Sequence, residues 1–146
     1  MTAIVLQGRV LNPGEARGAA LVLNEPLSFW GGFDPLSGRV IDRHHPQAGA
    51  ELAGKILVLP ESRGSAGTPA CVAEAIRRGT APLAIVLAKA DANIAAGAMV
   101  AAELYGREVP VVALSREDFG RLRSGDRLTV APDGKVTIDR GDYTKS

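Results

Sequence analysis

Three short apolar runs alternate with two helix-like segments in the second half of the chain, and this alternation restricts the fold more than any other feature. The runs are residues 55–60 (KILVLP), 83–88 (LAIVLA) and 109–115 (VPVVALS). Short apolar runs without polar alternation are typical of parallel strands that are buried on both faces. We therefore predict a β-α-β-α-β unit and an α/β fold.

The segments between these runs have recognisable helix ends. We predict a first helix over residues 69–79, with Thr68 as its N-cap, proline at its first position and Gly79 at its stop. We predict a second helix over residues 92–106, capped by Asp91. Ligands of such units gather beyond the carboxyl ends of the strands, so residues 60–67 lie where a site is expected.

The remaining strands are predicted at the two ends of the chain. Residues 2–11 and 19–24 read as two strands joined by a turn over residues 12–18. Residues 126–140 contain two apolar-alternating segments around Asp133-Gly134, which is a strong hairpin signal. Ser115, with aspartate three residues later, predicts a short helix before this hairpin.

Composition narrows the class of protein. The chain has 146 residues and 46% of them are hydrophobic, which suits one domain over residues 1–146. A net charge of +1 gives no electrostatic case for a nucleic-acid partner. No apolar run is long enough to span a membrane, and the N-terminus lacks the pattern of a secretion signal. We expect a cytoplasmic protein with no membrane partner.

Cys71 is the single cysteine. One cysteine cannot form an internal disulfide, and alone it cannot hold zinc or an iron–sulfur cluster. Its apolar neighbours favour a buried thiol. We therefore predict no metal site in this chain, and a metal that takes part in its work must have most of its ligands on another chain.

The segment LPESRGSAGTP, residues 59–69, is the first candidate site. If a helix follows it, the N–H groups of residues 64–67 lie at a helix N-terminus, which favours an anion. Arg63 adds a guanidinium suited to a carboxylate. Ser65 lies between these groups, and their positive dipoles would stabilise its alkoxide. A turn that only caps the helix is the alternative.

The second candidate lies in residues 25–54, a long stretch without periodicity. Loops of this length in compact domains are usually functional or disordered, and the aromatic content argues against disorder. The glycine pair beside two aromatic residues predicts a tight bend that is either a core anchor or a surface for a partner or substrate. The residues concerned are Ser28, Phe29, Trp30, Gly31 and Gly32.

The third candidate is the adjacent pair His44 and His45. Neighbouring side chains do not face the same way on a regular element, which weakens a two-histidine metal site. His45 could bind a substrate carboxylate, or either histidine could be an ordinary hydrogen-bonded loop residue.

Together, three segments resemble the small subunit of the aconitase X family. They are residues 14–49, 54–91 and 97–112, and the resemblance extends over roughly residues 8–114. The motifs PLSFWGG, D-x-x-H-P and RGS match in order and in spacing. One departure is Ala66, where many members of the family have a second serine.

The resemblance implies a swivelling β/β/α domain similar to the fourth domain of aconitase, with a central mixed sheet or barrel and flanking helices. It implies a partner large subunit that holds an iron–sulfur cluster, which activates the leaving hydroxyl. It also implies a dehydratase acting on a β-hydroxy carboxylate, either cis-3-hydroxy-L-proline, giving pyrroline-2-carboxylate, or mevalonate 5-phosphate. Ser65 would be the catalytic base, and the substrate-binding residues would be Arg63, Gly64, Ala66, Gly67 and His45.

Two functions of other classes remain open from the sequence. Swivelling domains also serve as phosphohistidine carriers, which would make His44 or His45 the phosphorylated residue. A partner-binding module without catalysis would use the loop over residues 25–54, called the aromatic loop below, only as an interface. Of the substrates, cis-3-hydroxy-L-proline is favoured because a phosphate-bearing substrate would want more cationic residues near the site than Arg63 and Arg43.

Overall fold

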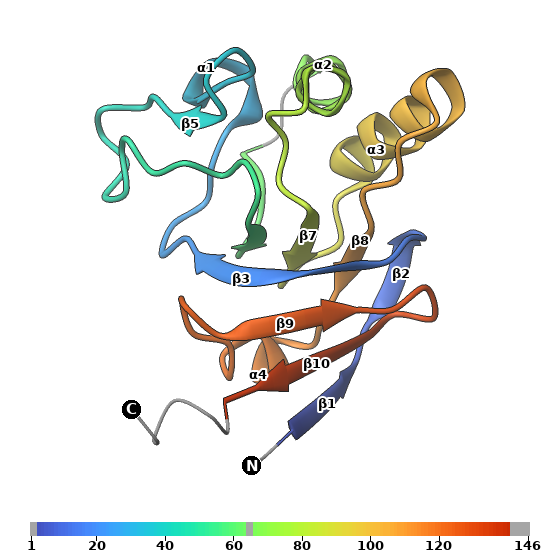
Figure 1. The fold of residues 1–146 in the computed structure, drawn as a ribbon. Helices are drawn as coiled ribbons and strands as arrows, with labels where there is room; N and C mark the ends of the chain where they lie inside the picture. The colour runs from blue at the N-terminus through green and yellow to red at the C-terminus, as the bar shows by residue number, and fades with distance from the viewer. Residues whose placement is uncertain (1–2, 64–65, 141–146) are drawn as a thin grey trace.

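The structure, a computed structural model, describes residues 3–63 and 66–140. A curved mixed sheet forms the lower half of the molecule in Figure 1, and two long helices lie above its parallel part. The sheet contains, in chain order, β1 (Ala3–Gln7), β2 (Arg9–Asn12), β3 (Ala16–Val22), β6 (Ile56–Leu59), β7 (Ala84–Leu87), β8 (Val111–Ala113), β9 (Arg127–Val130) and β10 (Lys135–Asp139). The helices are α1 (Phe29–Gly32), α2 (Thr68–Arg78), α3 (Ala92–Tyr105) and α4 (Arg116–Phe119), and β4 (Phe33–Asp34) pairs with β5 (Arg39–Val40).

The predicted β-α-β-α-β unit is confirmed. Strands β6, β7 and β8 run parallel, with Ile56 opposite Ala84 and Ile85 opposite Val111. Every residue of β6 and β7 is buried. Alternate side chains of β6 point to opposite faces, so Leu57 joins the core beneath the helices while Val58 joins the core inside the curved sheet. This double burial explains the unbroken apolar runs.

The N-terminal strands differ from the prediction in their partners. The predicted strand over residues 2–11 breaks at Gly8 into β1 and β2, which pair with β10 and β8 at opposite ends of the sheet order. The sheet is therefore closed by one bent stretch of chain. Gly8 is required at the bend, because a Cβ there would lie 2.9 Å from the Gly134 carbonyl oxygen. Strand β3 does not pair with β2; it pairs antiparallel with β9 and parallel with β6.

The C-terminal hairpin is confirmed, with β9 and β10 joined around Asp133-Gly134. A buried ion pair fixes its open end. The Arg140 guanidinium donates to the Asp126 carboxylate at 2.9 and 2.8 Å, and Asp126 is 3% exposed. Burial alone would raise the pKa of Asp126, but hydrogen bonds from Arg140 and from the Arg123 N–H lower it overall.

Three of the four predicted helix-capping residues are confirmed. The Asp91 carboxylate caps α3, Ser115 caps α4, and Gly79 ends α2 in the left-handed conformation. The prediction that Thr68 is the N-cap of α2 is wrong. Gly67 is the N-cap and contributes no side-chain hydrogen bond, while Thr68 is the first helical residue. A threonine before proline fits both positions, so the sequence alone did not separate them.

Helices α2 and α3 pack closely at Gly97. A Cβ on Gly97 would lie 2.7 Å from the Pro69 carbonyl oxygen and 2.8 Å from the Val72 Cβ. Because Pro69 belongs to the first turn of α2, this contact sets where the N-terminus of α2 lies. Neither helix, nor any other in the described part of the chain, is long and apolar enough to cross a membrane.

Candidate active site at the N-terminus of α2

The chain leaves the carboxyl end of β6 and turns beside the start of the aromatic loop. The Leu27 N–H donates to the Glu61 carbonyl oxygen at 3.4 Å, and the Arg63 N–H donates to the Leu27 carbonyl oxygen at 3.0 Å. Ser62 thus pairs with Leu27 in an isolated parallel β-bridge beyond the end of β6. Gly64 and Ser65, which follow, lie outside the described residues.

The two candidate motifs meet where Trp30 covers Gly67. A Cβ on Gly67 would lie 2.7 Å from both Cδ2 and Cε3 of the Trp30 indole, so only glycine allows this contact. Trp30 is nevertheless 64% exposed. One face of the indole packs on the N-cap of α2, and much of the ring remains open to solvent. Trp30 of the aromatic loop and the N-cap residue Gly67 therefore belong to one surface.

Residues 28–32 divide between this surface and the core. Trp30 and Gly31 are exposed, and Gly31 has a φ of 89°, which confirms the predicted tight bend. Phe29 is 1% exposed and packs edge-to-face on Phe33. Phe29 and Gly32 are buried within this chain, and Phe29 lines the hollow beside Trp30. Their part in an interface or a substrate wall stays a prediction. Ser28 is half-buried, and its hydroxyl donates to the Trp30 carbonyl oxygen at 2.8 Å.

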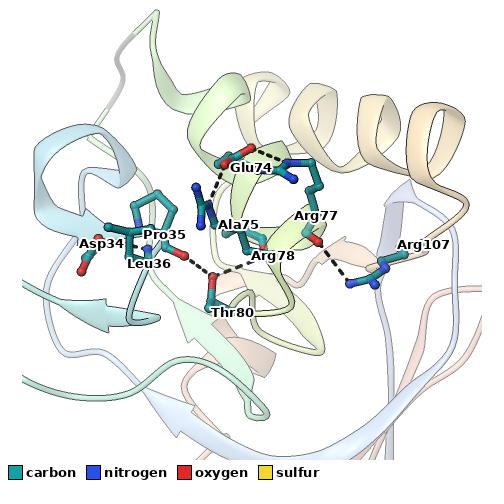
Figure 2. A network of polar contacts seen from close by, with 9 residues as sticks. All are labelled: Asp34, Pro35, Leu36, Glu74, Ala75, Arg77, Arg78, Thr80 and Arg107. Carbon is teal, nitrogen blue, oxygen red and sulfur yellow. Dashed lines mark hydrogen bonds and ion pairs between the residues drawn. The ribbon is translucent and has the colours of Figure 1, made fainter.

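The aromatic loop is fixed along the length of α2. In its first turn, the Cys71 thiol donates to the Phe29 carbonyl oxygen at 2.8 Å. At its C-terminal end, the Thr80 hydroxyl donates to the Pro35 carbonyl oxygen at 2.5 Å, as Figure 2 shows. Pro35 and Thr80 were not predicted to meet, and no local pattern signals a contact between residues so distant in sequence. The result is a loop held rigidly against the helix.

The N-terminus of α2 is electrostatically prepared for an anion. Its first turn contains no acidic residue and its N-cap offers no side-chain acceptor. The first N–H groups of a helix have no intrahelical acceptor, and the helix dipole is positive there. Arg63 and Ala66 are exposed, and Gly67 is half-buried. Their predicted role as one substrate-binding group stays a prediction.

His45 is held within its own loop. It is 5% exposed, its Nδ1 accepts from the Gln47 N–H at 3.0 Å, and its Nε2 lies 3.2 Å from the Glu25 carbonyl oxygen. Both ring nitrogens thus have backbone partners in that loop. The contact of His45 with a substrate stays a prediction. His44 is exposed.

Two other ionisable groups near the aromatic loop are poor bases or nucleophiles. Hydrogen bonds from Arg77 and Arg78 lower the pKa of Glu74 to about 2, so its carboxylate has little affinity for a proton at neutral pH (Figure 2). Burial, helped by the charge of Asp34, raises the pKa of the Cys71 thiol to about 11. The thiol is therefore protonated and unreactive at neutral pH.

A hollow of about 540 Å³ lies beside Trp30, between the aromatic loop and α2. Its lining includes Phe33, Ala70 and Cys71, so it is largely apolar. A larger hollow, of about 710 Å³, lies on the outer side of α3 against β2 and contains none of the predicted site residues. The motifs, and not the larger cavity, therefore locate the candidate site.

The described residues do not fit a metal cluster. No group of three or more histidine, cysteine, aspartate or glutamate side chains comes together in the part of the chain that the structure describes. The one thiol is buried and bonded to a backbone carbonyl. An iron–sulfur cluster that takes part in the chemistry is therefore not assigned to these residues.

Comparison with known proteins gives the family. The chain is 43% identical over 132 residues to a cis-3-hydroxy-L-proline dehydratase of Pseudomonas aeruginosa, a match to 90% of this chain but 22% of that protein. It thus spans about a fifth of the length of that relative. It is 39% identical to the phosphomevalonate dehydratase small subunit of Methanothermobacter thermautotrophicus, over 88% of this chain and 95% of that one.

A solved structure and a family description agree with these relatives. The crystal structure of Thermococcus kodakaraensis aconitase X in its holo-form superposes with a TM-score of 0.84, at 33% identity, over 94% of this chain and 99% of that chain. The predicted fold is thereby confirmed. Residues 5–138 match the description of the aconitase X swivel domain, and the chain belongs to that family.

Proposed function

We propose that the chain is the small subunit of an aconitase-X-type hydro-lyase that removes water from a β-hydroxy carboxylate. The observation that supports this most is the contact of exposed Trp30 with Gly67, the N-cap residue of α2. An exposed indole beside a helix N-terminus suits a site that a second protein completes. Family membership supplies the reaction class.

In this proposal the substrate carboxylate binds at the N-terminus of α2. Arg63 and the N–H groups of the 64–67 turn hold its negative charge. Ser65, as an alkoxide stabilised by the same positive groups, removes the proton from the carbon next to the carboxylate. The electron pair of that C–H bond forms the new double bond as the neighbouring C–O bond breaks and hydroxide leaves. The hydroxide takes a proton from solvent to become water, and Ser65 returns its proton to solvent to regenerate the alkoxide.

The remaining machinery belongs to the large subunit. The described residues offer no metal cluster, so we assign the iron–sulfur cluster of such enzymes to the partner. Glu74, which lines the hollow beside Trp30, is a weak base because its pKa is about 2, and we do not propose it for this role.

For the substrate we propose cis-3-hydroxy-L-proline, which would give pyrroline-2-carboxylate. Among the described cations, Arg77 and Arg78 lie in the last turn of α2, at the end away from the site, and Lys89 pairs with the Glu61 carboxylate at 3.8 Å, so little charge is left for a phosphate. Mevalonate 5-phosphate is the second candidate. It is favoured by one observation: the match covers 95% of a phosphomevalonate dehydratase small subunit.

A two-substrate assay tests the proposal. The chain is combined with the large subunit from the same organism, and dehydration of both compounds is followed under identical conditions. We expect turnover of cis-3-hydroxy-L-proline, none by either subunit alone, and a kcat/KM for mevalonate 5-phosphate at least about 100-fold lower, since an unpaired phosphate forfeits charge-assisted hydrogen bonds. The reverse preference would select the second candidate, and dehydration of neither compound would refute the proposal.

A further inference from the structure

The hydroxyl of Thr68 is a feature that the site described so far leaves unexplained. Thr68 is the first residue of α2 and is fully buried, at 0% exposure. Its Oγ1 has no hydrogen-bond partner among the residues that the structure describes. A buried hydroxyl without a partner costs free energy, which a valine of the same shape would avoid. The Thr68 hydroxyl therefore needs a hydrogen-bond partner from outside the described residues.

The position of Thr68 in the helix indicates where that ligand lies. In an α-helix the Cα–Cβ bonds tilt toward the N-terminus, so the side chain of Thr68 leans toward the segment before the helix. There, Gly67 packs beneath Trp30. The hydroxyl oxygen of Ser62, which precedes Arg63 in the sequence, is also buried and has no partner among the described residues.

The charge at this helix end indicates what kind of ligand fits. Thr68 and Ala70 hold two of the first N–H groups of the helix, which have no intrahelical acceptor, and Pro69 between them has none to donate. The first turn contains no acidic side chain that could accept from them. An acceptor with negative charge satisfies these N–H groups and the Thr68 hydroxyl together.

We propose that Thr68 is a substrate-binding residue whose hydroxyl donates a hydrogen bond to an oxyanion held at the N-terminus of α2. The proposal deepens the proposed function and rests on it, because the oxyanion is the carboxylate or the phosphate of the substrate. Hydrogen bonds from a neutral donor to a charged acceptor change affinity by roughly 10- to 100-fold. Thr68 thus adds affinity for the oxyanion beyond that which the exposed Arg63 supplies.

Kinetics of two variants in the assembled enzyme test this role. Thr68→Val keeps the shape and removes the hydroxyl, and Thr68→Ser keeps the hydroxyl. We expect Thr68→Val to lower kcat/KM by about 10- to 100-fold, mainly through KM, with a Tm equal to or above that of the wild type. Thr68→Ser should stay within about 3-fold of the wild type. Wild-type kcat/KM in Thr68→Val would refute the role, and so would a lowered Tm with unchanged KM, which indicates a buried structural water.

Anion binding by the full chain alone provides a readout that does not need activity. Inorganic phosphate and L-proline serve as probes, and the amide chemical shifts of Gly67 and Ala70 are followed by NMR. We expect a saturable shift with one probe or both, weakened at least about 10-fold in Thr68→Val. A response to L-proline assigns the carboxylate, and a response to phosphate assigns the phosphate.

The kinetic and NMR experiments together distinguish failure of this proposal from failure of the proposed function. If the assembled enzyme dehydrates neither candidate substrate but the Thr68-dependent shift remains, the oxyanion site stands and the hydro-lyase assignment falls. If the enzyme is active but neither probe shifts Gly67 or Ala70, or the shift is the same in Thr68→Val, the role of Thr68 is refuted.

Discussion

Replacing Ser65 with alanine is expected to lower the turnover of the assembled enzyme by at least about 10²–10³-fold, the usual cost of losing one well-placed group that handles charge in the transition state. The Glu74 carboxylate, with a pKa of about 2, is too weak a base to replace Ser65 in the proposed role. Steady-state kinetics with saturating large subunit would measure the loss in kcat.

The control for this prediction is Ser37→Ala, which removes an exposed serine at the other end of the aromatic loop. It should leave kcat unchanged. Analytical ultracentrifugation should show that Ser65→Ala still assembles with the large subunit. A Ser65→Ala enzyme with near-native turnover would remove the base assignment and favour a partner-binding module without catalysis.

Replacing Gly97 with valine should destabilise the chain by about 3 kcal/mol, at the upper end of the usual cost of overpacking. The added Cβ would lie 2.7 Å from the Pro69 carbonyl oxygen and 3.1 Å from the Pro69 Cα, which are backbone atoms that cannot rotate aside. Relief requires α2 to move away from α3. Since Pro69 begins α2, the same movement displaces the oxyanion site, and kcat/KM should fall as well.

Gly120→Val is the matched control for this prediction. The nearest atoms to a Cβ at Gly120 are the Arg116 and Glu117 carbonyl oxygens, at an ordinary 3.6 Å, and its φ is negative. Its effect on the free energy of unfolding should stay below about 1 kcal/mol, as is usual for exposed positions. Urea unfolding would compare the two variants, and equal stability would show that α2 and α3 do not pack at Gly97 as described.

The local parts of the fold could be predicted from sequence because each has its own signal. The apolar runs at β6, β7 and β8 report burial on both faces, and Asp133-Gly134 reports a tight turn. The partners of the N-terminal strand could not be predicted in this way. Whether residues 3–12 form one hairpin or close the sheet at both ends depends on β8 and β10, which lie about a hundred residues later.

The candidate site shows the same limit. The sequence marked the RGSAG turn and the aromatic loop separately, but not that Trp30 would lie on Gly67. It also could not tell which of two adjacent aromatic residues is buried: Phe29 fills the core and Trp30 faces outward. A histidine in a loop carries no sign of whether its ring nitrogens are free, and those of His45 are bonded to the backbone.

Hydrogen–deuterium exchange of the chain, alone and with the large subunit, asks whether the surface formed by Trp30, Gly31, Ala66 and Gly67 is the one that the partner completes. Exposed amides that become buried in an interface exchange more slowly. We predict slower exchange at these four residues on assembly. We predict unchanged exchange at the Asp133-Gly134 turn, which joins β9 and β10 away from α2 (Figure 1). Protection at that turn with none at Trp30 and Gly67 would contradict a shared active site at the N-terminus of α2.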